Sequence, residues 1–233
     1  MKKNSWLWIV VLLCITLIPV IVVLYTKSKN NFRNSAAPKP IWPVGVDEKG
    51  DTTFFQLPNF TAMNADSSLV STMELNGKIT VIETFFSTCQ SICPIMNRHM
   101  TRVYDALSIN KQFQIFSYTV DPERDDLQTL RAYAENHGAD LHQWKFLRAE
   151  QDSIYQFGRW SLKLPVGEGE EVGNFLHSER FVLVDWNRNI RGYYDGTDSV
   201  SVNRMMNDAV LLMSEKERMD KKQINAELKK RLN

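Results

Sequence analysis

Two cysteines are the residues of this chain whose types and spacing most clearly indicate chemistry. Cys89 and Cys93 are separated by three residues, are followed by Pro94, and come directly after the apolar run 79–86. Thiolates at a strand-to-helix junction serve either as a disulfide redox pair or as two soft metal ligands. We expect the helix N-terminus to lower the pKa of both thiols, because its unsatisfied N–H groups stabilise negative charge. The spacing alone leaves both interpretations open.

The elements that must position the two thiols alternate between strands and helices. Their order, βαβα followed by a hairpin and a helix, predicts an α/β fold with a mixed sheet and helices on both faces. Because the thiols directly follow the first central strand, this is the layout of a thioredoxin-like domain. Strands are expected over 52–57, 68–73, 78–86, 113–120, 145–147, 180–186 and 190–194, and helices over 94–107, from Asp125 or Asp126 to 136, over 153–157, and after Asp198 or Ser199.

His177 favours the metal interpretation. In a thioredoxin-like topology, the loop that enters the strand 181–185 lies against the cysteine loop, so a histidine there can reach a metal held by both thiolates. The glycine-rich segment 167–173 before it would let this histidine swing in and out. A Cys2His donor set suits copper in both of its oxidation states better than a closed zinc site, which takes four ligands. The other histidines are interpreted as structural; they are His99, His137 and His142.

Three carboxylates lie in or just after the expected central strands. Asp121 and Asp125 follow the strand 113–120, where they either shape the metal loop or form a turn and a helix cap. The turn and the cap are the favoured interpretation. Glu83 lies within an otherwise apolar strand, where burial raises its pKa or requires a partner. We assign it no role in the site.

The N-terminus predicts a membrane anchor. Residues 6–25 carry no charge over about the thickness of a bilayer core, and no small-residue cleavage site follows them. The expected organisation is an anchor over 1–25, a flexible tether over 26–51, a folded domain over 52–214 and a charged C-terminal tail over 215–233, interpreted as a solvated helical extension. The net charge of +1 argues against nucleic acid as a partner, and three cysteines are too few for a disulfide scaffold.

Three motifs resemble the Sco/SenC family of copper chaperones for cytochrome c oxidase. They are F-S-T-C-Q-S-I-C-P-I-M at 86–96, V-D-P-E-R-D at 120–125, and His177-Ser178 followed by L-V-D at 183–185. The likeness covers about residues 54–212, in the order and spacing of the family. It implies a thioredoxin-like fold that binds one copper ion, Cu(I) or Cu(II), through Cys89, Cys93 and His177.

The resemblance also implies a client and a compartment. The client would be the binuclear copper centre of cytochrome c oxidase subunit II, served by copper transfer or by reduction of that subunit's cysteines. Another periplasmic copper chaperone or a thiol reductant would be a further partner. The domain would face the periplasm from a single-pass helix in a bacterial inner membrane.

The first hypothesis is therefore a membrane-tethered copper metallochaperone rather than an enzyme. The alternative is a thiol–disulfide oxidoreductase that acts on oxidase cysteines or in redox defence through Cys89 and Cys93, for which His177 is dispensable. A copper-dependent redox sensor with the same three ligands is a third reading. A peroxidase is least favoured, because nothing marks a single sensitised cysteine with partners that bind peroxide.

Overall fold

The computed structural model describes residues 17–19, 44–46, 52–168, 175–176 and 178–232. Most of the predicted anchor, 1–25, and most of the predicted tether, 26–51, lie outside these residues. Within the described part of the chain, no helix is both long enough and apolar enough to cross a bilayer.

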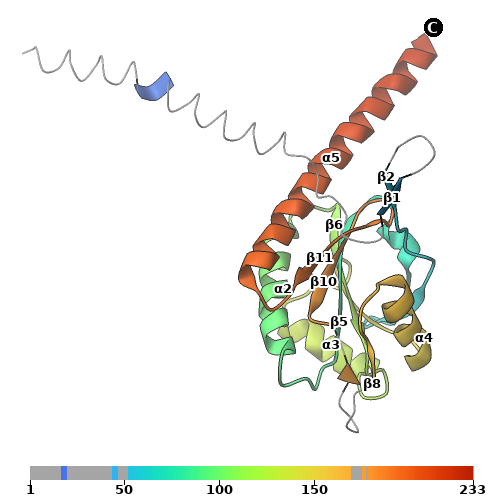
Figure 1. Cartoon of the computed structure of the whole chain (residues 1–233), viewed down its shortest axis with the longest axis vertical. Coiled ribbons are helices and arrows are strands. Elements are labelled where there is room, and N and C mark those ends of the chain that lie inside the picture. Colours follow the sequence, from blue (N-terminus) through green and yellow to red (C-terminus); the bar gives the residue numbers. More distant parts are fainter. Residues whose placement is uncertain (1–16, 20–43, 47–51, 169–174, 177, 233) are drawn as a thin grey trace, which may run out of the picture. The chain divides into compact units, whose positions relative to one another are not determined.

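A seven-stranded mixed sheet forms the centre of the fold, in the order β11-β10-β5-β6-β7-β3-β4 (Figure 1). The three central strands run parallel, and the strands outside them pair antiparallel. The sheet comprises β3 (Thr61–Asn64), β4 (Leu69–Ser71), β5 (Ile79–Phe85), β6 (Phe113–Thr119), β7 (Trp144–Arg148), β10 (Arg180–Val184) and β11 (Ile190–Asp195). The predicted mixed sheet is confirmed, whereas β3 was not expected from the sequence.

Two short antiparallel pairs accompany the sheet. β1 (Val44–Val46) pairs with β2 (Thr52–Phe54), and β8 (Gly167–Glu168) pairs with β9 (Phe175–Leu176). β1 lies within the segment expected as a tether, so regular structure begins earlier than residue 52. The expected strand 68–73 ends early, because residues Thr72–Leu75 form a 3-10 helix, η1, with a capping box between Ser71 and Glu74.

Helices cover both faces of the sheet, as expected for a thioredoxin-like fold (Figure 1). The helices are α2 (Cys93–Leu107), α3 (Leu127–Asn136), α4 (Gln151–Gln156) with the π-helical turn η2 (Phe157–Ser161), and α5 (Ser199–Leu232). On one face, α4 and η2 pack on an apolar cluster that includes Ile82 and Phe116. On the other face, the ring of Phe85 stacks on the ring of Tyr133 of α3, with 5.1 Å between the ring centroids. On this face α5 contacts both α2 and β11.

Local sequence signals explain why α2 and α3 begin and pack as they do. Pro94 occupies the first turn of α2, where its missing N–H leaves no bond unmade. The apolar stripe of α2 is buried as its spacing predicts; it comprises Met96, Met100, Val103 and Leu107. Of the two predicted caps of α3, Asp126 is the one used, and it accepts a hydrogen bond from Thr129 N at 2.7 Å.

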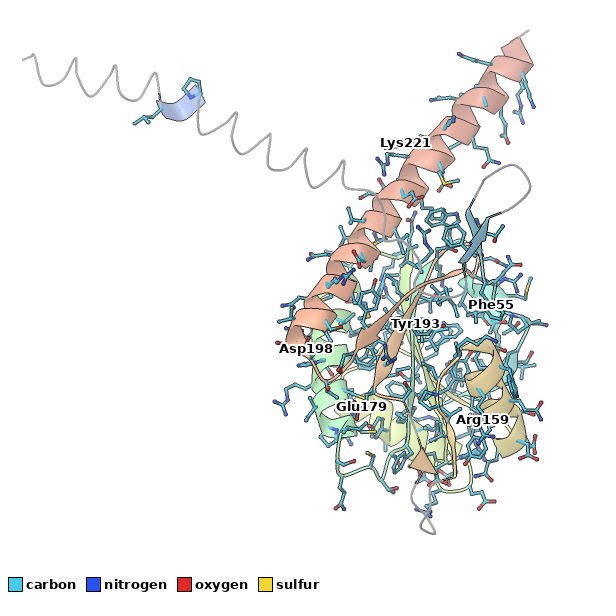
Figure 2. All side chains as sticks on the ribbon, in the orientation of Figure 1. Phe55, Arg159, Glu179, Tyr193, Asp198 and Lys221 are labelled. Atoms are coloured by element: carbon cyan, nitrogen blue, oxygen red, sulfur yellow. The ribbon has the colours of Figure 1, made fainter. Side chains whose placement is uncertain are left out.

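The last helix changes character along its length. The first half of α5 buries an apolar face against the sheet, which includes Val202, Met205, Ala209 and Leu212. The side chains of residues 221–231 are all exposed, and Figure 2 shows Lys221 projecting from this part of the helix. The second half is thus a solvated helical extension of the kind expected for the charged tail.

The two halves of α5 should respond differently to the same substitution. Leu212→Ala removes a fully buried side chain and should lower the free energy of unfolding by about 2–5 kcal/mol. Leu228→Ala removes a side chain that is 51% exposed and should change it by less than about 0.5 kcal/mol. Chemical denaturation of both variants measures the difference. Equal losses would contradict the solvated second half.

Candidate metal centre

The dithiol loop joins the end of β5 to the first turn of α2. Cys93 is the first residue of α2 and is 2% exposed, whereas Cys89 lies in the loop and is half-buried. No side chain caps the helix at Ile92. Backbone N–H groups of Ser91 and Cys93 hydrogen-bond to the sulfur of Cys89, whereas the backbone partner of the Cys93 sulfur is Phe86, which directly follows β5.

The pKa values of the two thiols are shifted in opposite directions. Burial raises the pKa of Cys89, but hydrogen bonds from the thiol and backbone of Cys93, and from Ser91, outweigh it and bring that pKa below its usual value. The Ser91 hydroxyl lies 3.6 Å from Cys89 Sγ. For Cys93, burial and the hydrogen bond to Cys89 raise the pKa well above its usual range. The predicted lowering is right for Cys89 and wrong for Cys93, because desolvation exceeds the stabilisation at the helix N-terminus.

A buried carboxylate fixes the start of this loop. Asp125 is fully buried and accepts hydrogen bonds from Ser87 N, at 3.1 Å to Oδ2, and from the hydroxyls of Ser87 and Thr119. The favoured interpretation of Asp125 as a helix cap is therefore wrong, and the alternative, that it shapes the cysteine loop, is right. Sequence reasoning did not single out Ser87, although its place two residues before Cys89 was a signal.

Asp121 forms a turn, as expected. Its Oδ2 atom lies 3.5 Å from Arg124 Nε, and its Oδ1 atom accepts a hydrogen bond from Arg124 N at 3.4 Å. Arg148 at the end of β7 donates to Pro122 O at 2.7 Å, which holds the same turn against the sheet. The hydrogen bond from Ser87 N to Asp125 then keeps the loop after β5 beside this turn, at the carboxyl ends of the parallel strands.

The third predicted ligand, His177, lies outside the described residues. The strand that follows it is well defined, because β10 pairs antiparallel with β5 through Val182–Ile82 and Val184–Thr80. This register places the start of β10, next to Glu179 in Figure 2, beside the end of β5 from which the cysteine loop departs. In the part of the chain that the structure describes, no three Cys, His, Asp or Glu side chains are grouped as a metal site.

Two of the three remaining histidines, His99 and His137, lie in structural settings. His99 Nδ1 lies 2.9 Å from Gly196 O, which ties α2 to the segment before α5. His137 is the C-cap of α3, and burial lowers its pKa. His142 is exposed.

Glu83 has both a raised pKa and a hydrogen-bond partner, the two possibilities that the sequence leaves open for a carboxylate within an apolar strand. It is 1% exposed in β5, where burial raises its pKa to about 7, and it has a partner, because the Ser117 hydroxyl donates to Oε1 at 2.6 Å.

These features define a thioredoxin-like domain with a dithiol at the start of a helix. The SCO1/SenC family model matches residues 49–213. The chain therefore belongs to the SCO1/SenC family.

Similar proteins cover most of the chain. The SCO1 protein homolog of Bacillus subtilis is 29% identical over 166 residues, which span 70% of this chain and 86% of the homolog. A structure of BsSco, described as a member of the Sco family of cytochrome c oxidase assembly proteins with a disulfide switch, is 25% identical with a TM-score of 0.62 and covers 76% of this chain and 98% of its own. Arabidopsis thaliana ScoI with copper bound shares the fold, with a TM-score of 0.57 and 21% identity over 70% of this chain and 98% of its own.

The unequal acidities predict selective alkylation. In the reduced, metal-free protein, iodoacetamide should modify Cys89 at least about tenfold faster than Cys93, because the thiolate is the nucleophile and only Cys89 has a lowered pKa. The Cys89 rate should level off at a lower pH than that of an ordinary thiol. Mass spectrometry of the modified peptides measures both rates. Comparable rates at the two cysteines would contradict the assigned asymmetry.

Adjacent aspartates provide a matched test of the loop anchor. Asp125→Ala leaves the donors of Ser87 and Thr119 unsatisfied, so we expect a loss of about 1–3 kcal/mol in unfolding free energy and faster amide exchange at Ser87. Asp126→Ala removes the cap of α3, with a cost of about 0.5–2 kcal/mol, and should leave exchange at Ser87 unchanged. Hydrogen-exchange NMR reads both variants. Wild-type exchange at Ser87 in Asp125→Ala would refute the anchoring role.

Proposed function

We propose that this chain is a copper metallochaperone for cytochrome c oxidase assembly, which carries one copper ion on Cys89, Cys93 and His177. One observation carries the proposal: two soft thiols lie at the start of α2, at the edge of the sheet where β10 begins, in a member of the SCO1/SenC family. Thiolates favour copper, and a bound cation offsets the cost of ionising a buried thiol such as Cys93.

In this proposal the two thiols have different roles when copper binds. Cys89 ionises more readily and is more accessible, so it is suited to take the metal first from a donor. Cys93 must lose its proton for the second bond, so loading releases protons and becomes weaker as the pH falls. Asp125 holds the loop through Ser87, so that Cys89 reaches the metal from a defined position.

The client of this proposal is the oxidase. The description of BsSco as a cytochrome c oxidase assembly protein supports it, and subunit II with its binuclear copper centre is the proposed acceptor. Residues 1–25 would anchor the domain in a bacterial inner membrane, facing the periplasm, with 26–51 as the tether. Another periplasmic copper chaperone or a thiol reductant would then load the domain or reduce it.

A thiol–disulfide oxidoreductase is the second candidate. The observation that favours it is the hydrogen bond between the thiols of Cys93 and Cys89, which brings the two sulfur atoms into contact. The disulfide switch named for BsSco is of the same chemistry. In this reading His177 is dispensable, because the reaction needs only the two thiols.

Copper binding by the reduced full-length protein separates the two candidates. We expect one tightly bound copper per chain, and His177→Ala should weaken the affinity by roughly tenfold or more, because it removes a ligand. His142→Ala is the matched control, since His142 is exposed and should leave binding unchanged. Weak binding that does not depend on His177, together with a readily cycling Cys89–Cys93 disulfide, would favour the oxidoreductase instead.

A further inference from the structure

The exposed second half of α5 concentrates positive charge. Residues 218–231, here named the basic tail, hold six basic and two acidic side chains, so their net charge is +4 while that of the whole chain is only +1. The side chains of 221–231 are all exposed, and Figure 2 shows Lys221 among them. The match of the family model ends at residue 213, so the basic tail is additional to the SCO1/SenC domain.

Four of the basic side chains lie together on one face of the helix. Arg218, Lys222 and Lys229 follow one another at spacings of four and seven residues, which places them on the same side of an α-helix. Lys221 lies beside them, and all four side chains line the same shallow hollow on the helix surface. Like charges at this spacing repel each other, so the face favours an anionic partner.

The acidic residues of the tail do not neutralise this basic face. Asp220 is paired with Lys216, with 2.6 Å between its Oδ2 atom and the ammonium nitrogen. Glu227 is two residues from Lys229, and side chains at that separation do not face each other on a helix. Among the described residues, no ion pair involves any of the four side chains of the basic face. Their charge is therefore available to a ligand.

Two exposed apolar side chains border the basic face. Ile224 and Leu228 are one turn apart, and they are 56% and 51% exposed. Lys221 precedes Ile224 by three residues, so the apolar pair adjoins the basic face rather than lying opposite it. Helices that lie in the interface of anionic membranes combine these two features, because apolar side chains enter the acyl boundary while basic ones stay with the phosphates.

We propose that the basic tail binds the surface of an anionic phospholipid bilayer. Lipid phosphates meet the four basic side chains, and Ile224 and Leu228 enter the interface. Charge complementarity alone would also suit a soluble polyanion. The bilayer is the better fit, because it is also a place where the exposed apolar pair leaves water.

The predicted membrane anchor makes a weak contact of this kind effective. Residues 6–25 would hold the domain next to a bilayer and so raise the effective concentration of the basic tail at its surface. The tail continues without a break from the first half of α5, which packs on the sheet. Binding of the tail therefore restricts the orientation of the whole domain toward the membrane. It needs no copper and no particular ligand set at the dithiol.

Hydrogen exchange of the full-length, metal-free protein in lipid nanodiscs tests this proposal. Peptides from 218–231 report the tail itself, whatever holds residues 1–25. With about 30% phosphatidylglycerol in the discs, tail amides should exchange at least about tenfold more slowly than in phosphatidylcholine discs, because a helix end held at a surface opens less often. Salt at about 0.5 M should remove most of this protection, since it screens the phosphates.

Two double variants with the same change in charge isolate the basic face. Lys222→Gln/Lys229→Gln should bring the protection to within about twofold of the phosphatidylcholine value, because each basic residue near an anionic surface strengthens binding roughly fivefold. Lysine and glutamine have similar helix propensities, so exchange in phosphatidylcholine discs should not change. Arg98→Gln/Lys111→Gln is the matched control. It removes two exposed charges outside the tail and should keep the wild-type protection.

A third double variant tests the apolar pair at constant charge. Ile224→Ser/Leu228→Ser should lose most of the protection in anionic discs, because neither side chain can then enter the interface. Protection that is equal in the two kinds of disc, or that persists in either tail variant, would overturn the proposal. Protection by soluble polyglutamate that anionic discs do not give would overturn it in favour of an acidic protein partner.

Discussion

The thiol of Cys93 lies out of solvent at the first residue of α2, and ionising it there costs free energy because water no longer stabilises the charge. Its hydrogen bond to Cys89 also changes the pKa of that second thiol. Since Cys93 keeps its proton, it can donate to Cys89 and favour the thiolate there. Desolvation of Cys93 thus leaves that thiol protonated and makes Cys89 more acidic. Any reaction in which Cys93 loses its proton must therefore stabilise the negative charge that forms on its sulfur.

The sheet holds this arrangement in place through the ends of parallel strands. β5 and β6 run in register up to Phe85–Thr119, so the loops that follow them leave from the same edge. Asp125 can therefore reach Ser87, although the two residues lie far apart in sequence. Beneath the loop, the buried hydrogen bonds from Trp144 through Ser117 to Glu83 connect three adjacent strands. The polar groups around the dithiol are thus ordered by the same strand register that builds the core.

Elements with strong local patterns could be predicted well from the sequence. The apolar stripe of α2, the cap at Asp126 and the hairpin of β10 and β11 each depend on neighbours along the chain. β3 was not predicted, because its four residues carry a weak alternation and are held by pairing with β4 and β7. The role of Asp125 in the cysteine loop was the less favoured of two interpretations, since a carboxylate after a strand caps a helix more often than it binds a distant loop.

The sequence by itself determined the thioredoxin-like order of elements, the two thiols at the strand-to-helix junction and the family, because periodicity and motif spacing are local properties of the chain. The candidate ligand His177 also came from the sequence and stays a prediction, since it lies outside the described residues. Only the tertiary structure decided the acidity of each thiol, the anchoring by Asp125 and the environment of Glu83. All three depend on burial and on contacts between distant segments, and no local pattern encodes how much water a folded chain removes from one atom.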